Sequence, residues 1–424
     1  MKALVWGLGE SGQGAIELLK ARGYQVLGAK DGDLEPEEAL KGMDLLVLSP
    51  GISPRHKIIK LAKDLEIETI GELELAWRFF RGTALAITGT DGKSTTTRML
   101  YLILKRVYGD KVFEGGNAGL AFSRIVLKDP EAIAVLEVSS FQGRSLKTFR
   151  PKVGAFLNFS PDHLDWHEDI WDYLYSKHRI FLNQTEEDFL LLNGIDNRIK
   201  RAFGAGKKFF IPQDGKLEGK RGIFFGETLF ENLKLKCKHN AINALFAGAM
   251  AKLFGVETTV IKEVLESFTG LEHRLELVKE IKNVKIFNDS KSTTPNALKA
   301  ALECFEDKSV ILIAGGKNKG LSFKELKTLV KRKLIACFLI GESKEEIATE
   351  LSFNNLELCD TLEEATKKAI KLALSCGKEC QVLFSPGCAS FDMFKSYRER
   401  GEKFKALAES YSHSMVEGGL EDIS

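Results

Sequence analysis

The sequence predicts an α/β protein of three domains, each with a mostly parallel sheet covered by helices. Short runs rich in Val, Ile and Phe alternate with longer helical patterns along the whole chain, which is typical of parallel sheets. The chain has 424 residues, which at about 150 residues per domain corresponds to about three domains. The pattern restarts after residues 81 and 270, so we expect domains at 1–81, 82–270 and 271–424, with a polar tail from about residue 411.

The expected strands are short, apolar and rich in β-branched residues. They are KALVW (2–6), DLLVLS (44–49), LAIT (85–88), AIAVLEV (132–138), VGAFLNF (153–159), DFLLLN (188–193), VKIFN (284–288), VILIAGG (310–316), IACFLIG (335–341) and CQVLFSP (380–386).

Composition excludes several classes of function. Lys and Arg number 61 and Asp and Glu 59, a net charge of +2, too balanced for a protein that coats nucleic acid or an anionic membrane. The first residues lack the apolar region of a signal peptide, and no apolar run is long enough to span a membrane. The seven cysteines include no C-x-x-C pair, which argues against a disulfide framework or a zinc site. We therefore expect a cytoplasmic protein.

The first glycine-rich motif is GLGESG (7–12), which follows strand 2–6 and opens a helix, with Asp31 where a ribose-binding acid is expected. A second glycine turn, Ser49-Pro50-Gly51, follows strand 44–49. Glycines let the backbone approach a diphosphate, and a helix N-terminus offers free N–H groups. The pattern indicates a nucleotide diphosphate site, although a tight strand-to-helix turn uses the same residues.

The strongest motif is TGTDGKSTT (88–96), between strand 85–88 and a helix. Its glycines admit phosphates, Lys93 neutralises them, and the Ser94 hydroxyl can bind Mg²⁺. The G-x-x-G-K-S spacing is shorter than that of the common phosphate loop. Two nucleotide sites in two domains argue against a simple dehydrogenase.

The central domain contains three further candidate residues. Glu137 ends strand 132–138, where a Mg²⁺ ligand is expected, and His163 follows strand 153–159. Taken alone, each of these two residues more often has a structural role. Lys177, in YLYSKHRI, has the pattern of an ordinary helix-surface lysine.

The remaining candidates are polar side chains at element ends. Asn240 and Asn243 share a helix face and suit an adenine edge, or simply cap the helix. In the third domain, NDSKST (288–293), GGKNKG (315–320) and SPGCAS (385–390) each follow a strand, so their lysines and hydroxyls are expected at one sheet edge, suited to a small anion.

Taken in order, these motifs resemble the Mur ligase family along essentially the full chain. They include TGTDGKSTT, LEVSSFQ, NFSPDHLDWH, YSKHRI, HNAINA, HRLE, NDSKSTTP, AGGKNKG and SPGCASFDMF. The resemblance implies a Rossmann-like N-terminal domain for a UDP precursor, a P-loop-type central ATPase domain and a Rossmann-like C-terminal domain for the incoming amino acid. The motifs SSFQ, NDSKST and SPGCASFDMF resemble those of the family members that add D-glutamate to UDP-N-acetylmuramoyl-L-alanine through an acyl phosphate. The resemblance therefore implies a cytoplasmic enzyme that uses ATP and two Mg²⁺ ions. We expect this enzyme to be a monomer.

The resemblance also implies a role for each matching residue. Lys93, His163, Lys177, Lys291 and Lys319 are expected in catalysis, and Ser94, Glu137, His163 and a carbamylated Lys177 as metal ligands. The expected ATP contacts are Thr90, Asp91, Gly92, Lys93, Ser94, Thr95, Thr96, Asn240, Asn243, Arg274 and Asp289. The expected contacts to the UDP precursor or to D-glutamate are Gly9, Glu10, Ser11, Asp31, Ser49, Pro50, Gly51, Asn117, Ser139, Gln142, Thr293, Lys319, Ser390, Phe391 and Tyr397.

The sequence departs from the family pattern at Asp91, where an Asn is usual, and at Gly32-Asp33, where an arginine often helps to hold UDP. Three alternatives stay open at this point. They are a relative that adds another amino acid, an NAD-dependent oxidoreductase built on GLGESG, and a nucleotide-binding protein without catalysis.

Overall fold

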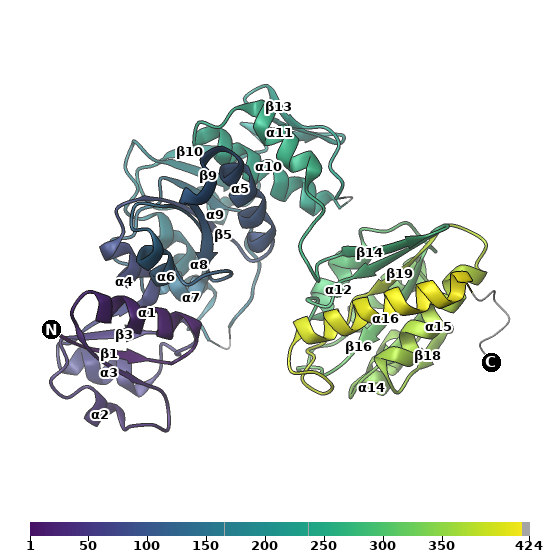
Figure 1. Cartoon of the computed structure of the whole chain (residues 1–424), viewed down its shortest axis with the longest axis horizontal. Coiled ribbons are helices and arrows are strands. Elements are labelled where there is room, and N and C mark those ends of the chain that lie inside the picture. Colours follow the sequence, from purple (N-terminus) through teal and green to yellow (C-terminus); the bar gives the residue numbers. More distant parts are fainter. Residues whose placement is uncertain (165, 236, 418–424) are drawn as a thin grey trace. The chain divides into compact units, whose positions relative to one another are not determined.

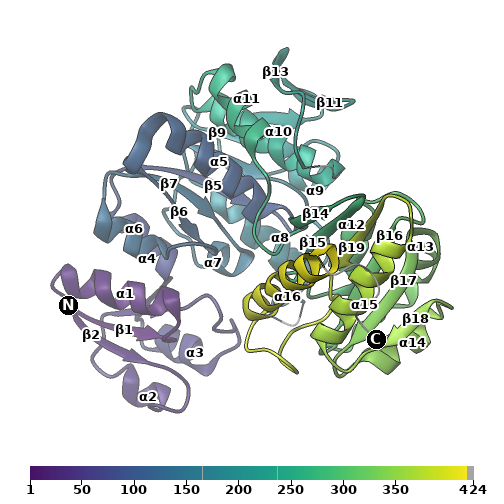
Figure 2. The same ribbon diagram turned by 45° about the vertical axis from the view of Figure 1, so that its right-hand side comes forward.

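The computed structural model describes residues 1–164, 166–235 and 237–417. The chain divides into two compact units, Met1–Phe268 and Thr269–Ser424, which are described separately (Figures 1 and 2). The predicted α/β class is confirmed, because three sheets are mostly parallel and carry helices on their faces. No helix in the described ranges combines the length and the apolar character that a membrane crossing requires.

The first unit begins with a four-stranded parallel sheet in the order β2-β1-β3-β4. Its strands are β1 (Lys2–Trp6), β2 (Gln25–Ala29), β3 (Leu45–Leu48) and β4 (Glu68–Gly71), and its helices are α1 (Glu10–Ala21), α2 (Pro36–Ala39), α3 (Lys57–Asp64) and α4 (Glu72–Phe79). Strands β1 and β3 match the prediction. Strands β2 and β4 were not predicted, because polar or partly exposed residues interrupt their apolar pattern.

The second sheet of this unit has six parallel strands in the order β10-β9-β8-β5-β7-β6. The strands are β5 (Thr83–Thr88), β6 (Val112–Gly116), β7 (Ile133–Glu137), β8 (Val153–Phe156), β9 (Phe189–Asn193) and β10 (Lys207–Ile211). The chain moves from β5 to one edge and returns through β7 to β8 on the other side of β5. This change of direction places the ligand crevice of such sheets at the carboxyl end of β5.

Helices cover both faces of this sheet, and a small antiparallel sheet follows it. The helical segments are α5 (Lys93–Tyr108), η1 (Gly109–Lys111), α6 (Phe122–Lys128), α7 (Ser140–Arg144), α8 (Ile170–His178), η2 (Arg179–Phe181), α9 (Asn197–Lys200), α10 (Lys238–Leu253) and α11 (Thr258–Ser267). The small sheet consists of β11 (Gly215–Glu218), β12 (Arg221–Phe224) and β13 (Glu227–Phe230). Its strands were not among those predicted from the sequence.

Helix α4 joins the two larger sheets of the first unit through two buried carboxylates. Glu72 Oε1 accepts a hydrogen bond of 2.6 Å from Ser123 N, near the start of α6. Glu74 accepts bonds from the backbone N–H groups of Lys147 and Thr148 and from the Thr148 hydroxyl. One hydrophobic core runs through both sheets. The two sheets are therefore held together by polar bonds as well as by apolar packing.

The second unit contains a six-stranded sheet in the order β14-β15-β19-β16-β17-β18, in which only β14 is antiparallel. The strands are β14 (Glu276–Ile281), β15 (Val284–Asn288), β16 (Val310–Gly315), β17 (Leu334–Ile340), β18 (Leu356–Leu358) and β19 (Cys380–Phe384). The helical segments are α12 (Pro295–Leu302), η3 (Lys324–Leu326), α13 (Lys327–Lys333), α14 (Lys344–Leu351), α15 (Leu362–Ser375) and α16 (Tyr397–Glu417).

Helices α15 and α16 lie side by side on one face of this sheet in both views (Figures 1 and 2), and their apolar residues form one core with it. Helices α12, α13 and α14 contribute to a second core. Helix α16 continues to Glu417 through the first part of the segment expected to be a polar tail, and residues 418–424 lie outside the described residues.

Candidate active site

The phosphate loop connects β5 to α5 at the carboxyl edge of the second sheet. Gly92, which precedes α5, has a φ of 83°, a left-handed conformation that favours glycine. A Cβ atom at Gly92 would lie 2.3 Å from Asn243 Oδ1, so only glycine fits here. Lys93 Nζ donates hydrogen bonds to Gly89 O at 3.0 Å and to Thr90 O at 2.7 Å. The loop thus offers a helix N-terminus and an ammonium group to an anion.

Asn158 braces this loop, and the sequence analysis did not select it. Its Oδ1 accepts hydrogen bonds from Thr90 N at 3.1 Å and from Asp91 N at 2.8 Å, and its Nδ2 donates to Asp91 O at 3.0 Å. The signal in the sequence was a polar residue directly after a strand that neighbours the phosphate-loop strand. A side chain with a donor and an acceptor can hold both backbone groups of Asp91 at once.

Glu137 ends β7, the strand beside β5, and its side chain is almost completely buried. Oε1 accepts a hydrogen bond of 2.7 Å from Asn117 Nδ2. Within the part of the chain that the structure describes, neither Glu137 Oε2 nor the buried Thr96 Oγ1 has a hydrogen-bond partner. A buried carboxylate oxygen without a partner is costly unless a cation satisfies it. The donor set of Glu137 and the hydroxyls of α5 fits a Mg²⁺ ion, which prefers hard oxygen ligands.

Lys177 is buried, with 1% of its surface exposed, so its interpretation as a helix-surface lysine is wrong. It lies on the inner side of α8, where Nζ donates a hydrogen bond of 2.7 Å to Gly89 O and lies 4.7 Å from the centroid of the Tyr173 ring. Burial, followed by the nearby charge of Lys93, lowers the pKa of Lys177 well below its ordinary value. The sequence analysis also missed Tyr173, whose hydroxyl lies 3.1 Å from Thr90 Oγ1.

His163 lies on the loop after β8 and adopts a left-handed conformation, with a φ of 53°. Its ring packs edge-on against Phe141 of α7, with 4.8 Å between the ring centroids, and is partly exposed. His167, four residues later, is completely buried. The structure thus brings Glu137, His163 and Lys177 to the same edge of one sheet as the phosphate loop.

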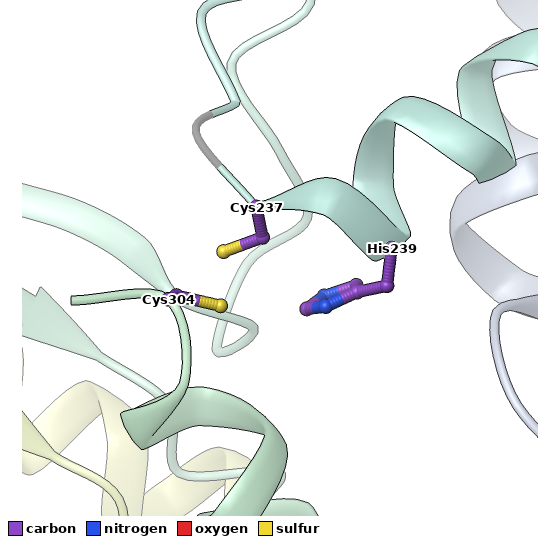
Figure 3. A group of neighbouring side chains, drawn as sticks. All are labelled: Cys237, His239 and Cys304. Atoms are coloured by element: carbon purple, nitrogen blue, oxygen red, sulfur yellow. The ribbon is translucent and has the colours of Figure 1, made fainter. Parts of the chain in front are cut away.

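Helix α10 carries Asn240 and Asn243, the two residues predicted to contact adenine. Cys237 precedes the helix and His239 lies in its first turn (Figure 3). Asn243 is buried beside Gly92, whereas Asn240, one turn earlier, is partly exposed. The placement of Asn243 shows that this helix packs directly against the phosphate loop.

The two predicted precursor loops of the first sheet touch each other. Ser49 Oγ donates a hydrogen bond of 2.7 Å to Gly7 O. Asp31 Oδ1 lies 2.8 Å from His56 Nε2 and accepts a bond of 3.2 Å from Trp6 Nε1. The other predicted residues here, Gly9, Glu10, Ser11, Pro50 and Gly51, follow the carboxyl ends of β1 and β3.

Three residues predicted to contact substrate also bond to other groups of the protein. They are Glu10, Ser139 and Gln142. Glu10 pairs with Arg124 of α6. Ser139 and Gln142 form a capping box at the start of α7, in which Gln142 Oε1 accepts from Ser139 N at 3.1 Å. These bonds place the three side chains without requiring a ligand.

In the second unit, Asp289 lies buried just after β15. Oδ2 accepts a hydrogen bond of 2.8 Å from Ser385 Oγ, and Oδ1 accepts one of 3.1 Å from Leu275 N. Burial raises the pKa of Asp289 to about 7. Lys291 Nζ lies 5.4 Å from the centroid of the Tyr397 ring.

The other predicted residues of this unit differ in exposure. Ser390 is buried, Phe391 and Lys319 are exposed, and Thr293 and Arg274 are partly buried.

Arg400 of α16 is a functional candidate that the sequence analysis missed. Its guanidinium is completely buried and donates to Ser290 Oγ, Ser290 O, Cys388 O and Ala389 O at 2.8 to 3.1 Å. Burial lowers the pKa of Arg400 to about 10, so it stays charged at neutral pH. Arg400 ties the loop after β15 to the loop after β19, which carry Lys291 and Ser390.

A phosphate loop at the switch point of a parallel sheet, with a buried glutamate and a buried lysine at the same sheet edge, defines an α/β nucleotide-binding enzyme. Two family models match the chain: the Mur ligase middle domain at residues 87–251, and the Mur ligase, glutamate ligase domain at residues 273–387. The chain belongs to the Mur ligase family.

Curated relatives match over nearly the full chain. The UDP-N-acetylmuramoylalanine--D-glutamate ligase of Aquifex aeolicus (strain VF5) is 52% identical over 417 residues, covering 96% of this chain and 99% of the relative. The protein of the same name from Hydrogenobaculum sp. (strain Y04AAS1) is 42% identical over 423 residues, covering 98% and 100%.

Solved structures show the same fold at low identity. The UDP-N-acetylmuramate-alanine ligase of Thermotoga maritima has a TM-score of 0.62 at 18% identity, covering 97% of this chain and 99% of that one. The MurF ligase of Thermotoga maritima in complex with ADP has a TM-score of 0.58 at 20% identity, covering 89% and 91%. The family models and the curated relatives confirm the predicted family, and the solved structures show the same fold.

Proposed function

We propose that this chain is an ATP-dependent ligase that joins D-glutamate to UDP-N-acetylmuramoyl-L-alanine. The observation that carries the proposal is the 52% identity to a ligase of that name over 96% of the chain. The buried surroundings of the phosphate loop support it. Precursor synthesis of this kind takes place in the cytoplasm, and the predicted cytoplasmic location and monomeric state stay predictions.

The chemistry follows from the weakness of a carboxylate as an electrophile. An oxygen of the L-alanyl carboxylate attacks the γ-phosphorus of ATP, ADP leaves, and an acyl phosphate forms. The neutral amine of D-glutamate then attacks the carbonyl carbon, loses a proton, and expels inorganic phosphate as the amide bond forms. The first transfer depends on positioning and on stabilisation of negative charge. The α5 N-terminus, the loop N–H groups and Lys93 supply this positive potential.

The residues that would hold Mg²⁺ lie at the sheet edge that carries the phosphate loop. Glu137 Oε2 is buried without a partner in the described ranges, and Ser94 is the second residue of α5, so these two would hold one ion. His163 and a carbamylated Lys177 would hold a second. When bound, divalent cations neutralise the charge of the phosphate oxygens.

Carbamylation of Lys177 is supported by the low pKa of its amine. A neutral amine nitrogen attacks the carbon of CO₂, a proton passes to solvent, and a carbamate anion remains. An ammonium group cannot carry out this reaction, so the burial of Lys177 favours the modification. The carbamate would supply hard anionic oxygens and would keep one N–H for Gly89 O.

The remaining assignments divide between the two units. In the first, Asp31, Ser49, Asn117 and the loop Gly9–Ser11 would meet the UDP precursor, and Asn240 and Asn243 the adenine. In the second, Arg274 and Asp289 would contact ATP. The D-glutamate and acyl phosphate contacts would be Lys291, Thr293, Lys319, Ser390, Phe391 and Tyr397.

The deciding experiment measures phosphate release from ATP by the full chain with UDP-N-acetylmuramoyl-L-alanine and a panel of amino acids. We expect release with D-glutamate and none without an amino acid. Release with a different amino acid would assign the chain to another ligase of the family. Lys93→Ala is the control, because phosphate release that persists in this variant does not come from this loop.

A further inference from the structure

His167 is bonded through each of its polar groups to a different segment of the first unit. The backbone N donates to His163 O at 3.0 Å, and the backbone O accepts from Arg55 Nη2 at 3.2 Å. Nδ1 lies 2.8 Å from Asp172 Oδ2, and Nε2 lies 2.9 Å from Ser140 Oγ. The side chain has no exposed surface. One residue thus joins the loop after β8, the loop after β3, α7 and α8.

The two ring bonds assign the position of the imidazole proton. Asp172 also pairs with Arg144, and an ionised carboxylate can only accept hydrogen bonds. Nδ1 therefore carries a hydrogen and donates it to Asp172, and Nε2 shares a hydrogen bond with the Ser140 hydroxyl, which can donate or accept. Both ring nitrogens of His167 are thus bonded, which fixes the orientation of the ring.

The segments that His167 joins are those that carry the expected metal ligands. Ser140 begins α7, three residues after Glu137, and Asp172 lies on α8 with Lys177. His163 itself accepts the bond from the backbone N of His167. Three separate segments thus carry Glu137, His163 and Lys177. His167 bonds to His163 itself, to Ser140 just after Glu137, and to Asp172 on the helix of Lys177.

Aromatic packing holds His163 and His167 against the same two rings. Phe141 lies 4.8 Å from His163 and 5.7 Å from His167 between ring centroids. Tyr173 lies 6.1 Å and 5.2 Å from the same two rings. A shift of the His167 ring would therefore be transmitted to His163 through shared neighbours.

We propose that His167 is a positioning residue that sets the relative places of Glu137, His163 and Lys177. The proposal rests on the proposed function for the role of those three residues as metal ligands. Groups that orient metal ligands typically change metal affinity by about 10- to 100-fold when they are removed. A histidine that only filled the core would affect folding stability and leave the dependence on metal unchanged.

The test compares three variants of the full chain. His167→Phe keeps a ring against Phe141 and Tyr173 and removes both ring bonds. Ser140→Ala leaves His167 in place and removes only the bond to Nε2, so it also serves if His167→Phe folds poorly. The matched control is His178→Phe, a buried histidine at the end of α8 whose ring, within the described ranges, bonds only Arg198 O.

Two quantities are measured, together with the thermal unfolding midpoint. The first is the Mg²⁺ concentration that gives half-maximal phosphate release. The second is the affinity for Mn²⁺, a probe whose free ion gives an electron paramagnetic resonance signal that is lost on binding. We expect His167→Phe to weaken both by about 10-fold or more, Ser140→Ala to shift both less in the same direction, and the KM for D-glutamate to stay within about twofold of wild type.

Unchanged metal dependence in a folded His167→Phe variant would overturn the proposal, as would an equal shift in His178→Phe. The proposed function fails separately, if wild type releases no phosphate with D-glutamate. In that case the Mn²⁺ comparison still tests the role of His167, because it needs neither amino acid nor turnover.

Discussion

Lys177 Nζ and Gly89 O are joined by a hydrogen bond of 2.7 Å that links α8 directly to the phosphate loop. The same carbonyl accepts a bond of 3.0 Å from Lys93 Nζ. Burial, and then the nearby charge of Lys93, lowers the pKa of Lys177 well below its ordinary value. The two lysines thus share one acceptor at the phosphate loop.

The first prediction concerns Lys177→Ala. Loss of the amine removes the carbamate that we propose as a metal ligand, so phosphate release should fall by at least about 100-fold, the size expected when a charged group at a transition state is lost. Short carboxylic acids such as acetate or propionate should restore part of the activity, because their carboxylate can occupy the space of the carbamate. The measurement is the rate of phosphate release against acid concentration.

Lys93→Ala is the control for this rescue. Its missing group is a cation, so the same acids should restore nothing. Full activity of Lys177→Ala without added acid would be evidence against the carbamate, and equal rescue of both variants would show that the effect of the acid is not specific.

The second prediction concerns Glu137→Gln. The amide keeps the size of the side chain and an oxygen for Asn117, but it removes the negative charge expected to hold Mg²⁺. Half-maximal activity should require at least about 10-fold more Mg²⁺. Glu114→Gln is the control, since Glu114 is a partly buried carboxylate on the neighbouring strand β6 that pairs with Arg98. If both variants need the same Mg²⁺ concentration as wild type, Glu137 is not a metal ligand.

The strands that the sequence predicted are those that are apolar on both faces. β5, β7 and β16 read as continuous apolar runs because helices cover both sides of their sheets. The missed strands lie mostly at sheet edges, as β2, β4, β6 and β18 do, or in the small antiparallel sheet, where polar residues break the pattern. Edge position depends on strand order, which no local pattern contains.

The candidate site shows the same limit. Glycine and lysine spacing was enough to predict the phosphate loop, because its chemistry is local. Lys177 was interpreted as a surface residue because the sequence pattern does not show which side of α8 packs against the phosphate loop. Asn158, His167 and Arg400 were missed for a related reason, since each acts by bonding segments that are distant in sequence.

The third prediction concerns Arg400→Lys. A lysine keeps the charge but cannot reach four acceptors on two loops at once, so the loops carrying Lys291 and Ser390 should lose their fixed spacing. We expect the KM for D-glutamate to rise by about 10-fold, as a loss of about 1.4 kcal/mol in binding implies, with a change below about twofold in the KM for UDP-N-acetylmuramoyl-L-alanine. Steady-state kinetics with each substrate varied in turn measures both.

Lys403→Met, an exposed position on the same helix, is the control for Arg400→Lys and should leave both constants unchanged. If Arg400→Lys raises the two KM values equally, Arg400 does not act on the amino-acid loops in particular.

The fourth prediction concerns pH and Asp289. The pKa of this buried carboxyl is about 7 in the folded protein, above its ordinary value of 3.8, so the folded state keeps a proton that the unfolded state releases. The contribution of the Asp289 carboxyl to the free energy of unfolding is therefore complete below about pH 4 and is lost as the pH rises to about 7. Asp289→Asn, which stays neutral, should therefore gain thermal stability relative to wild type between pH 5 and pH 8, with a difference on the order of a few kcal/mol.

The measurement is the unfolding midpoint of both proteins at several pH values and constant ionic strength. Asp307→Asn is the control in the same unit, because Lys333 lowers the pKa of Asp307 and its contribution is lost only in more acidic solution. The difference between Asp307→Asn and wild type should stay constant from pH 5 to pH 8, whereas that for Asp289→Asn should grow. Parallel curves for wild type and Asp289→Asn would contradict this prediction, because they would mean that Asp289 is ionised from pH 5 to pH 8. The ionised carboxylate could then accept a hydrogen bond from a ribose hydroxyl even in mildly acidic solution.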